Sequence, residues 1–186
     1  MHTSQLYFLL LGCKPPGRHT EQHDVFFGIG ESLKELVPAM LAFWPEAKKN
    51  LHIDAWRAVQ SVQGYTVRVR LKTEPATGNS DLKLFFINLG GYRKEEFEEH
   101  HQKLLIVAQD LPDAVYAAKQ EVFYKTTGFK GASAHIDDKY GIDVDEAYEV
   151  EELLPAEFSA YALDIIPQEQ KADEIHLGYL PLWKIK

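Results

Sequence analysis

The sequence has a single cysteine and no long hydrophobic run, and each shortage excludes a class of protein. Cys13 alone cannot form an intramolecular disulfide, and it excludes a zinc site built from cysteines. The longest apolar run near the N-terminus, Leu6 to Leu11, is too short to span a bilayer or to form the core of a secretion signal. We therefore expect a cytoplasmic protein with no membrane partner.

Basic residues are also scarce, with 20 Lys and Arg against 28 Asp and Glu and a formal net charge of −8. Nucleic-acid-binding proteins usually carry a basic patch interleaved with aromatic residues. Here the one basic alternation, Arg68, Arg70 and Lys72, is typical of the solvated face of an amphipathic strand. No nucleic-acid partner is expected, whereas a protein partner, a small-molecule ligand and a homo-oligomer all stay compatible with the sequence.

The chain contains two related halves. Leu6–Gly12 resembles Leu84–Gly90, and His23 lies as far from His101 as Gly12 lies from Gly90. The triplet His52-Ile53-Asp54 recurs as His135-Ile136-Asp137, with an insertion in the second half. Further on, Tyr65–Val69 matches Tyr161–Ile165. Apolar and polar positions that repeat together predict a tandem duplication.

The repeat predicts the domain organisation. We expect a first module copy at residues 1–72, a linker at 73–83, a second copy at 84–166 and a C-terminal tail at 167–186 that ends in a strand or extended arm. The predicted linker is rich in turn-forming residues and almost free of apolar ones, which is typical of a connection between modules.

Each copy is expected to fold as strand, strand, helix, strand. In the first copy, Leu6–Leu11 is predicted to be a buried strand and Val25–Ile29 a second one. Ser32 and Glu35 form a capping-box pattern before a helix, and Asp110 is the expected cap in the second copy. The apolar residues of the first helix recur at helical spacing: Leu33, Leu36, Val37, Met40, Leu41 and Trp44. The fold class is therefore α+β, a duplicated strand-strand-helix-strand module whose halves pack with pseudo-two-fold symmetry.

The histidines and nearby carboxylates are the candidate functional residues. His23 and His101 are predicted in loops before the second strand of each copy, where each could reach the triplet of its own half. A His oriented by a carboxylate is the usual arrangement of an acid–base catalyst or a metal ligand. The catalytic candidates are His23, His52, Asp54, His101, His135 and Asp137. Alternatively, each triplet is a short extended segment whose His and Asp bond backbone groups at a turn.

A divalent metal is the one cofactor that this pattern allows, and none is otherwise predicted. Two His and one carboxylate suit zinc or iron. The second half supplies the metal candidates His101, His135 and Asp137, with Glu99, His100 and Asp138 close by in sequence.

Cys13 could act as a nucleophile beside His19 or His23, but its counterpart is Gly91. A lone cysteine is more often a small core residue. Because no established catalytic motif is present, we interpret the chain first as a non-catalytic module that binds a small ligand or a protein. The alternative is a hydrolase-like or metal-assisted enzyme that uses the duplicated His/His-x-Asp pattern.

The same residues resemble a known family. The resemblance rests on Gly12, Glu21, His23 and Asp24, followed by Leu51–Asp54 and Gly64–Tyr65. This pattern is similar to the Domain of Unknown Function 1543 family, as a member with two copies. The resemblance implies a bacterial and cytoplasmic protein and supplies no activity. The usual Gly-Gly after the first strand is Gly12-Cys13 here, so the second glycine is missing from this copy.

Overall fold

A largely apolar strand, β1 (Gln5–Cys13), lies inside a four-stranded antiparallel sheet. Its residues Leu6, Leu9 and Leu11 are fully buried, as predicted for a continuous apolar run, whereas Phe8 and Leu10 on the same strand are only partly buried. The strand order is β10-β3-β1-β2, with β2 (Gln22–Gly30) and β3 (His52–Val59) on either side of β1. The C-terminal strand β10 (His176–Pro181) forms one edge of this sheet by pairing with β3.

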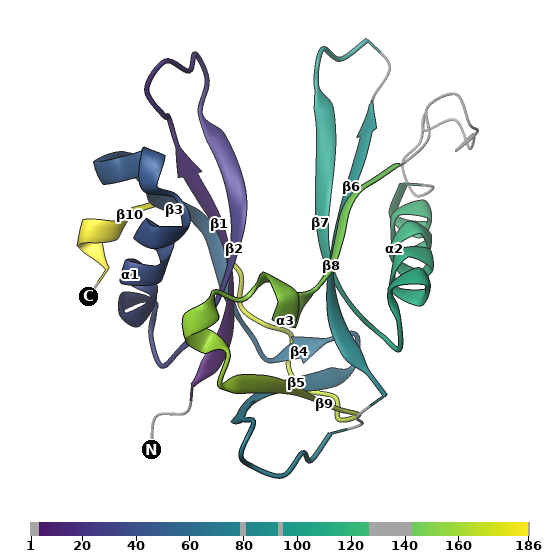
Figure 1. Cartoon of the computed structure of the whole chain (residues 1–186). Coiled ribbons are helices and arrows are strands. Elements are labelled where there is room, and N and C mark those ends of the chain that lie inside the picture. The colour runs from purple at the N-terminus through teal and green to yellow at the C-terminus, as the bar shows by residue number, and fades with distance from the viewer. Residues whose placement is uncertain (1–3, 79–80, 93–94, 127–142, 186) are drawn as a thin grey trace. The chain divides into compact units, whose positions relative to one another are not determined.

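The computed structural model describes residues 4–78, 81–92, 95–126 and 143–185. These residues form two compact units (Figure 1). Unit 1 comprises Met1–Asn79 and Leu153–Lys186, and unit 2 comprises Ser80–Glu152. Strand pairs in both units are antiparallel, and together with the helices they confirm the α+β class. No helix in the described part of the chain is both long and apolar enough to cross a membrane.

Helix α1 (Leu33–Phe43) packs on β2 through a narrower stripe than the sequence predicts. Leu36 and Met40 are buried as expected, whereas Leu41 is exposed. The expected capping box is wrong, because the Ser32 side chain makes no cap hydrogen bond and the Glu35 carboxylate accepts from the backbone N–H of Glu31 at 2.8 Å instead of that of Ser32. A short 3₁₀ helix, η1 (Pro45–Asn50), then leads directly into β3.

Unit 2 is built on a three-stranded sheet with the order β7-β6-β8. Its strands are β6 (Lys83–Tyr92), β7 (Glu99–Ala108) and β8 (Asp143–Glu149). Helix α2 (Leu111–Thr126) begins after Asp110, whose carboxylate accepts from the Asp113 N–H at 2.9 Å, which confirms the expected cap. The core of the unit contains Phe85, Ile87, Leu89, Leu104, Ile106, Ala108, Ala114 and Ala118.

The two sheets share strand order and register where the polar residues lie. Gly12 of β1 pairs with His23 on one side and His52 on the other. Gly90 of β6 pairs in the same way with His101 and Asp143. In both sheets the pairing shifts just before the glycine, between Leu10 and Leu11 or between Asn88 and Leu89. Strand β8 therefore has the position in unit 2 that β3 has in unit 1.

A third sheet joins strands that the sequence assigns to different module copies. Its order is β4-β5-β9, where β4 is Ser61–Val62, β5 is Tyr65–Leu71 and β9 is Tyr161–Ile166. After β8 the chain passes through α3 (Val150–Leu153) and η2 (Ala156–Phe158), and β9 then pairs along the length of β5. This backbone ladder places the end of the predicted second copy in unit 1. Unit 2 consequently ends at Glu152, short of the expected boundary at 166.

The pairing of β5 with β9 encloses an acidic side chain between two arginines. Asp164 is buried and accepts hydrogen bonds from Arg68 at 2.8 Å and from Arg70 at 2.7 Å. The predicted solvated face of β5 is confirmed for Arg68, whose side chain is 48% exposed, and is wrong for Arg70, whose side chain is 17% exposed. Burial by itself raises the pKa of Asp164, but hydrogen bonds from Arg70, Thr77 and Arg68 outweigh it and lower that pKa to about 2.

The depressed pKa of Asp164 predicts a loss of stability in acid. A carboxyl whose folded pKa is below its unfolded value stabilises the fold fully above the unfolded value, and this stabilisation is lost as the pH falls through the folded one. The shift from 3.8 to about 2 corresponds to roughly 2 kcal/mol. Urea unfolding should show Asp164→Asn less stable than wild type at pH 6, with the difference shrinking between pH 4 and about 2. The exposed Glu157→Gln is the control, and a difference that does not change with pH would contradict this role for Asp164.

Candidate functional site

Four polar side chains of unit 1 converge beside Gly12, and we call them the unit 1 cluster: Glu21, His23, His52 and Asp54. Nε2 of His23 lies 3.1 Å from Oδ2 of Asp54, and Nε2 of His52 lies 3.4 Å from the same oxygen. The carboxylate of Glu21 contacts both histidines, with Oε1 at 2.9 Å from His52 Nε2 and Oε2 at 4.0 Å from His23 Nε2. The structure thus brings together the three candidates that the sequence predicts in this half.

The hairpin between β1 and β2 places His23 in this cluster. The prediction that His23 and His101 lie in loops is wrong, because β2 begins at Gln22 and β7 begins at Glu99. Their antiparallel ladders extend to Cys13↔Gln22 and Tyr92↔Glu99, so both histidines are strand residues opposite a glycine. On the other side of β1, the shift in pairing with β3 leaves Asp54 without a direct partner and lets its carboxylate approach His23.

His52 is oriented by a backbone carbonyl. Its Nδ1 lies 2.9 Å from the carbonyl oxygen of Asn50, and a carbonyl can only accept a hydrogen bond. Nδ1 therefore carries a proton, so that in the neutral form of the imidazole the lone pair of Nε2 would point toward Glu21 and Asp54. Metal-binding histidines have this arrangement, in which the second ring nitrogen donates to a carbonyl or carboxylate.

The lone pair of Nε2 faces two carboxylates without a hydrogen bond. His52 Nε2 and Asp54 Oδ2 are both enclosed atoms that lack a hydrogen-bond partner of acceptable geometry. The short distance from Glu21 Oε1 is therefore a close electrostatic approach rather than an aligned hydrogen bond. Lone pairs that face one another at this distance repel unless a cation lies among them. A proton would have to point at one of the oxygens, whereas a metal ion could be shared by all the donors.

Gly12 provides the space for these side chains. A Cβ atom at this position would lie 2.3 Å from Asp54 Oδ2 and 2.6 Å from His52 Nε2. Any larger residue would thus displace the two donor atoms. At Gly90 a Cβ would lie 2.3 Å from Asp145 Oδ2. Both β1 and β6 therefore have a glycine where an aspartate carboxylate packs directly against the backbone.

The unit 1 cluster has a buried side and an open side. The His52 side chain is 4% exposed, while those of His23 and Glu21 are 43% and 46% exposed. Solvent therefore reaches the cluster at His23 and Glu21, and the Asp54 side chain is 25% exposed.

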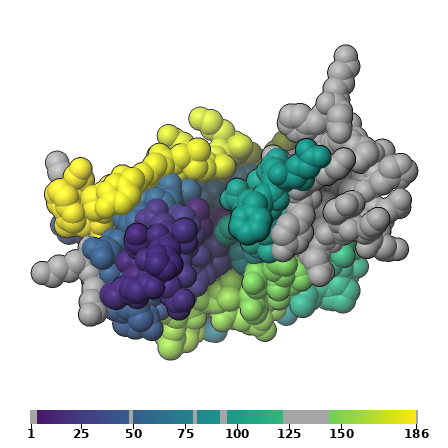
Figure 2. Space-filling model, turned by 90° about the horizontal axis from the view of Figure 1, so that it is seen from above, coloured from purple at the N-terminus to yellow at the C-terminus, as the bar shows by residue number. Residues whose placement is uncertain are grey.

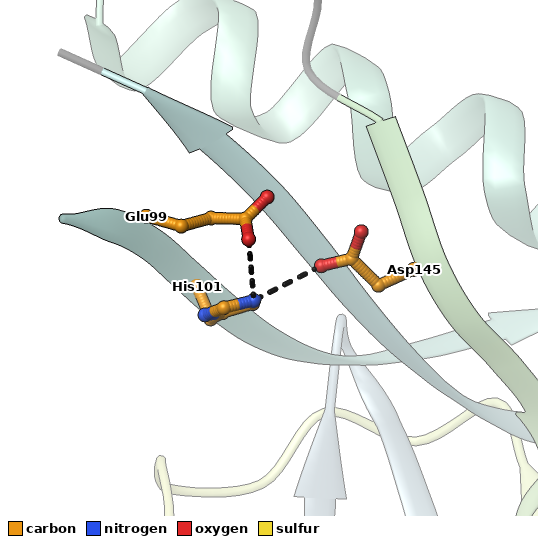
Figure 3. A group of neighbouring side chains, drawn as sticks. All are labelled: Glu99, His101 and Asp145. Carbon is orange, nitrogen blue, oxygen red and sulfur yellow. Dashed lines mark ion pairs between the residues drawn. The ribbon is translucent and has the colours of Figure 1, made fainter.

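Among its described residues, unit 2 brings together one imidazole and two carboxylates: His101, Glu99 and Asp145 (Figure 3). His101 Nε2 lies 3.2 Å from Oδ2 of Asp145 and 3.8 Å from Oε2 of Glu99. These three are the only group among the described residues whose donor atoms all lie within 4.8 Å of one another. In the unit 1 cluster each donor atom lies close to one or two of the others, but the donor atoms do not all lie within 4.8 Å of one another. At the register position of His52, unit 2 has Asp143.

Several predicted residues do not join these clusters. His135 and Asp137 lie outside the described residues, so their roles stay a prediction. His100 contacts Glu96 at 2.6 Å on the surface, not His101. Cys13 is buried, and burial together with Glu21 and Glu46 raises the pKa of its thiol, which makes it a poor nucleophile. Sequence reasoning missed Asp145, although its spacing from Asp143 repeats that of Asp54 from His52.

Comparison with solved structures defines the fold. The chain is similar to the crystal structure of a protein Il1583 from Idiomarina loihiensis, with a TM-score of 0.64 and 22% identity. The alignment covers 96% of this chain and 98% of that one. At this identity the likeness establishes the shared fold alone. None of the curated proteins matches the chain.

The family follows from a more local match. Residues 18–69 match the model described as Domain of Unknown Function (DUF1543), which confirms the predicted family. The matched segment contains the whole unit 1 cluster and ends within β5. Residues 18–69 thus match the DUF1543 family within a chain of α+β fold.

Replacing Gly12 tests how tightly the cluster is packed. Gly12→Ala should lower the free energy of unfolding by about 1–3 kcal/mol, because the new Cβ overlaps the enclosed His52 and Asp54 atoms. Gly91→Ala is the matched control, since a Cβ there would meet nothing within 4 Å and should change stability by less than about 0.5 kcal/mol. Urea denaturation monitored by circular dichroism measures both. Equal stability of the two variants would show that the cluster is looser than described.

Proposed function

We propose that this protein binds a divalent first-row transition-metal ion at the unit 1 cluster. The observation that carries the proposal is His52, whose Nδ1 donates to Asn50 and whose enclosed Nε2 faces Glu21 and Asp54 without a hydrogen bond. A metal ion among these atoms would turn facing lone pairs into coordinating ones.

The spacing of the donors supports a transition metal. Adjacent donors lie 2.9, 3.1, 3.4 and 4.0 Å apart in the unit 1 cluster. A metal with bonds of about 2.1 Å places neighbouring ligands about 3.0–3.4 Å apart, and the three shorter contacts are close to this spacing. The donor atoms do not all lie within 4.8 Å of one another, so metal binding must bring His23 closer to Glu21 and must also draw together the donors on opposite sides of the cluster. Two imidazoles with carboxylates suit Zn²⁺, Fe²⁺ or Co²⁺, whereas Mg²⁺ and Ca²⁺ prefer sites made entirely of oxygen.

The repeated register supports a duplicated module behind this site. In both units a glycine of the central strand pairs with a histidine, and an acidic residue stands two positions before that histidine. In both units the pairing on the other side of the central strand shifts just before the glycine, and an aspartate lies at this shift. We infer that β1–β2–α1–β3 and β6–β7–α2–β8 descend from one ancestral unit. In the second unit Asp143 has the register position of His52, and the described group Glu99, His101 and Asp145 contains a single imidazole, so we expect it to bind a transition metal more weakly.

The local relation of β5 to β9 agrees with the inferred duplication. The predicted equivalence of Tyr65 with Tyr161 also makes Arg68 equivalent to Asp164. These same two residues face each other in the antiparallel pair. When two equivalent strands pair antiparallel with equivalent residues opposite each other, a local two-fold axis passes between those residues. The inferred duplication predicts such an axis for β5 and β9.

Metal titration of protein purified without a histidine tag tests the proposal. Apoprotein prepared with a chelator should bind one Zn²⁺ or Co²⁺ tightly, with a dissociation constant of about 1 µM or lower. His52→Ala should weaken this binding by about 100-fold or more, because it removes the buried ligand. Isothermal titration calorimetry gives affinity and stoichiometry, and Co²⁺ absorption in the visible region reports the ligand geometry.

The matched control is His101→Ala, which alters the corresponding histidine of unit 2 and should leave the tight site intact. His23→Ala should weaken it. Absence of stoichiometric binding, or unchanged binding in His52→Ala, would refute the metal site and leave a proton among the donors as the explanation of the geometry.

Metal-assisted hydrolysis is the second candidate function. The exposed side formed by His23 and Glu21 favours it, because a catalytic metal needs a coordination position open to water or substrate. Metal-loaded protein would then hydrolyse simple phosphate or carboxylate esters, and His23→Gln would abolish turnover at full metal occupancy. Metal binding without turnover of either ester class would leave the non-catalytic ligand-binding function.

A further inference from the structure

The C-terminal strand β10 reaches the unit 1 cluster from the far end of the chain. It pairs with β3 along the edge of the sheet, and Pro181 lies opposite His52. The C-terminal residues, yellow in Figure 2, lie against the blue residues of unit 1. In the described part of unit 2, the sheet has no fourth strand beside β8, so this contact distinguishes the two otherwise similar sheets.

A bulge in β10 places an aromatic ring against His52. The pairing with β3 shifts between Leu177 and Leu180, and Gly178 within this bulge has a φ of +115°. Glycine adopts this conformation without strain. The chain then presents Tyr179, whose ring centroid lies 4.4 Å from that of His52 at an interplanar angle of 45°. A second ring contact fixes the start of the strand, where His176 stacks on Trp56 at 3.9 Å.

We propose that Tyr179 is a positioning residue for the metal site. Its ring packs against the imidazole of His52 and limits rotation of that ring, so that Nε2 keeps facing Glu21 and Asp54. The hydrogen bond from Nδ1 to Asn50 fixes one point of the ring, and Tyr179 restricts the tilt about that point. The benzene ring of Tyr179 is sufficient for this role, and its hydroxyl is not needed.

The proposed role rests on the proposed metal binding but also has a consequence in the absence of metal. Tyr179 is 69% exposed, so it covers His52 while contributing little to the core. Removing its ring should therefore change the accessibility of His52 more than the stability of the fold.

Metal affinity tests the inference directly. Tyr179→Ala should raise the dissociation constant for Co²⁺ by about 10-fold or more, as expected when a contact that orients a metal ligand is lost. Tyr179→Phe should restore wild-type affinity, because it keeps the ring contact. Leu177→Ala is the control on the same strand, since Leu177 is 81% exposed and pairs opposite Ala55 rather than His52. Wild-type affinity in Tyr179→Ala, or equally weak binding in Tyr179→Phe, would overturn the proposal.

Chemical modification of the apoprotein separates this inference from the metal site. Diethylpyrocarbonate should modify His52 several-fold faster in Tyr179→Ala than in wild type or Leu177→Ala, as measured by peptide mass spectrometry. Gly178→Ala provides a second variant that keeps the ring but strains the bulge, and it should increase the rate in the same direction. If wild type binds no metal, the metal site fails while this measurement still judges Tyr179. Equal rates in all variants would overturn the role of Tyr179.

Discussion

The enclosed Nε2 of His52, facing two carboxylates, is the interaction on which the arrangement of unit 1 depends. Each neighbouring feature contributes to it. Gly12 leaves room for the His52 and Asp54 side chains, and the Asn50 carbonyl holds the proton of His52 on Nδ1. The shift in pairing between β1 and β3 leaves Asp54 unpaired in the ladder, with its carboxylate beside Gly12. An unpaired polar atom in an enclosed position costs stability. A cation bound beside Nε2 would remove this cost. The proposed metal binding therefore accounts for the geometry better than a purely structural turn does.

The sequence predicts the local structure of unit 1 and the residues of its cluster well. Apolar runs and cap residues identify β1, β2 and α1, because burial on both faces and helical periodicity leave direct marks in the chain. His23, His52 and Asp54 meet as expected. Their strand position was not predicted, since the polar residues Gln22–Asp24 conceal the extension of the hairpin from a search for apolar runs.

In the second half, the repeated triplet His135-Ile136-Asp137 lies outside the described residues, so its role stays a prediction. Asp143 has the register position of His52 there, and Asp145, like Asp54, lies at the shift in pairing. Identity of residue type is a weaker guide than position in a ladder, and only the pairing of β6 with β8 reveals that position. The pairing of β9 with β5 was hidden for a related reason, because partners far apart in sequence leave no periodic signal.

Anomalous diffraction from crystals grown with Co²⁺ or Zn²⁺ would test the metal site most directly. Data collected on either side of the absorption edge locate the ion without reference to any assumed chemistry. The account predicts one strong peak within bonding distance, about 2.0–2.3 Å, of His23 Nε2, His52 Nε2 and Asp54 Oδ2. A peak at another place would contradict it. So would the absence of a peak beside His52 in crystals in which His52 keeps its hydrogen bond to Asn50.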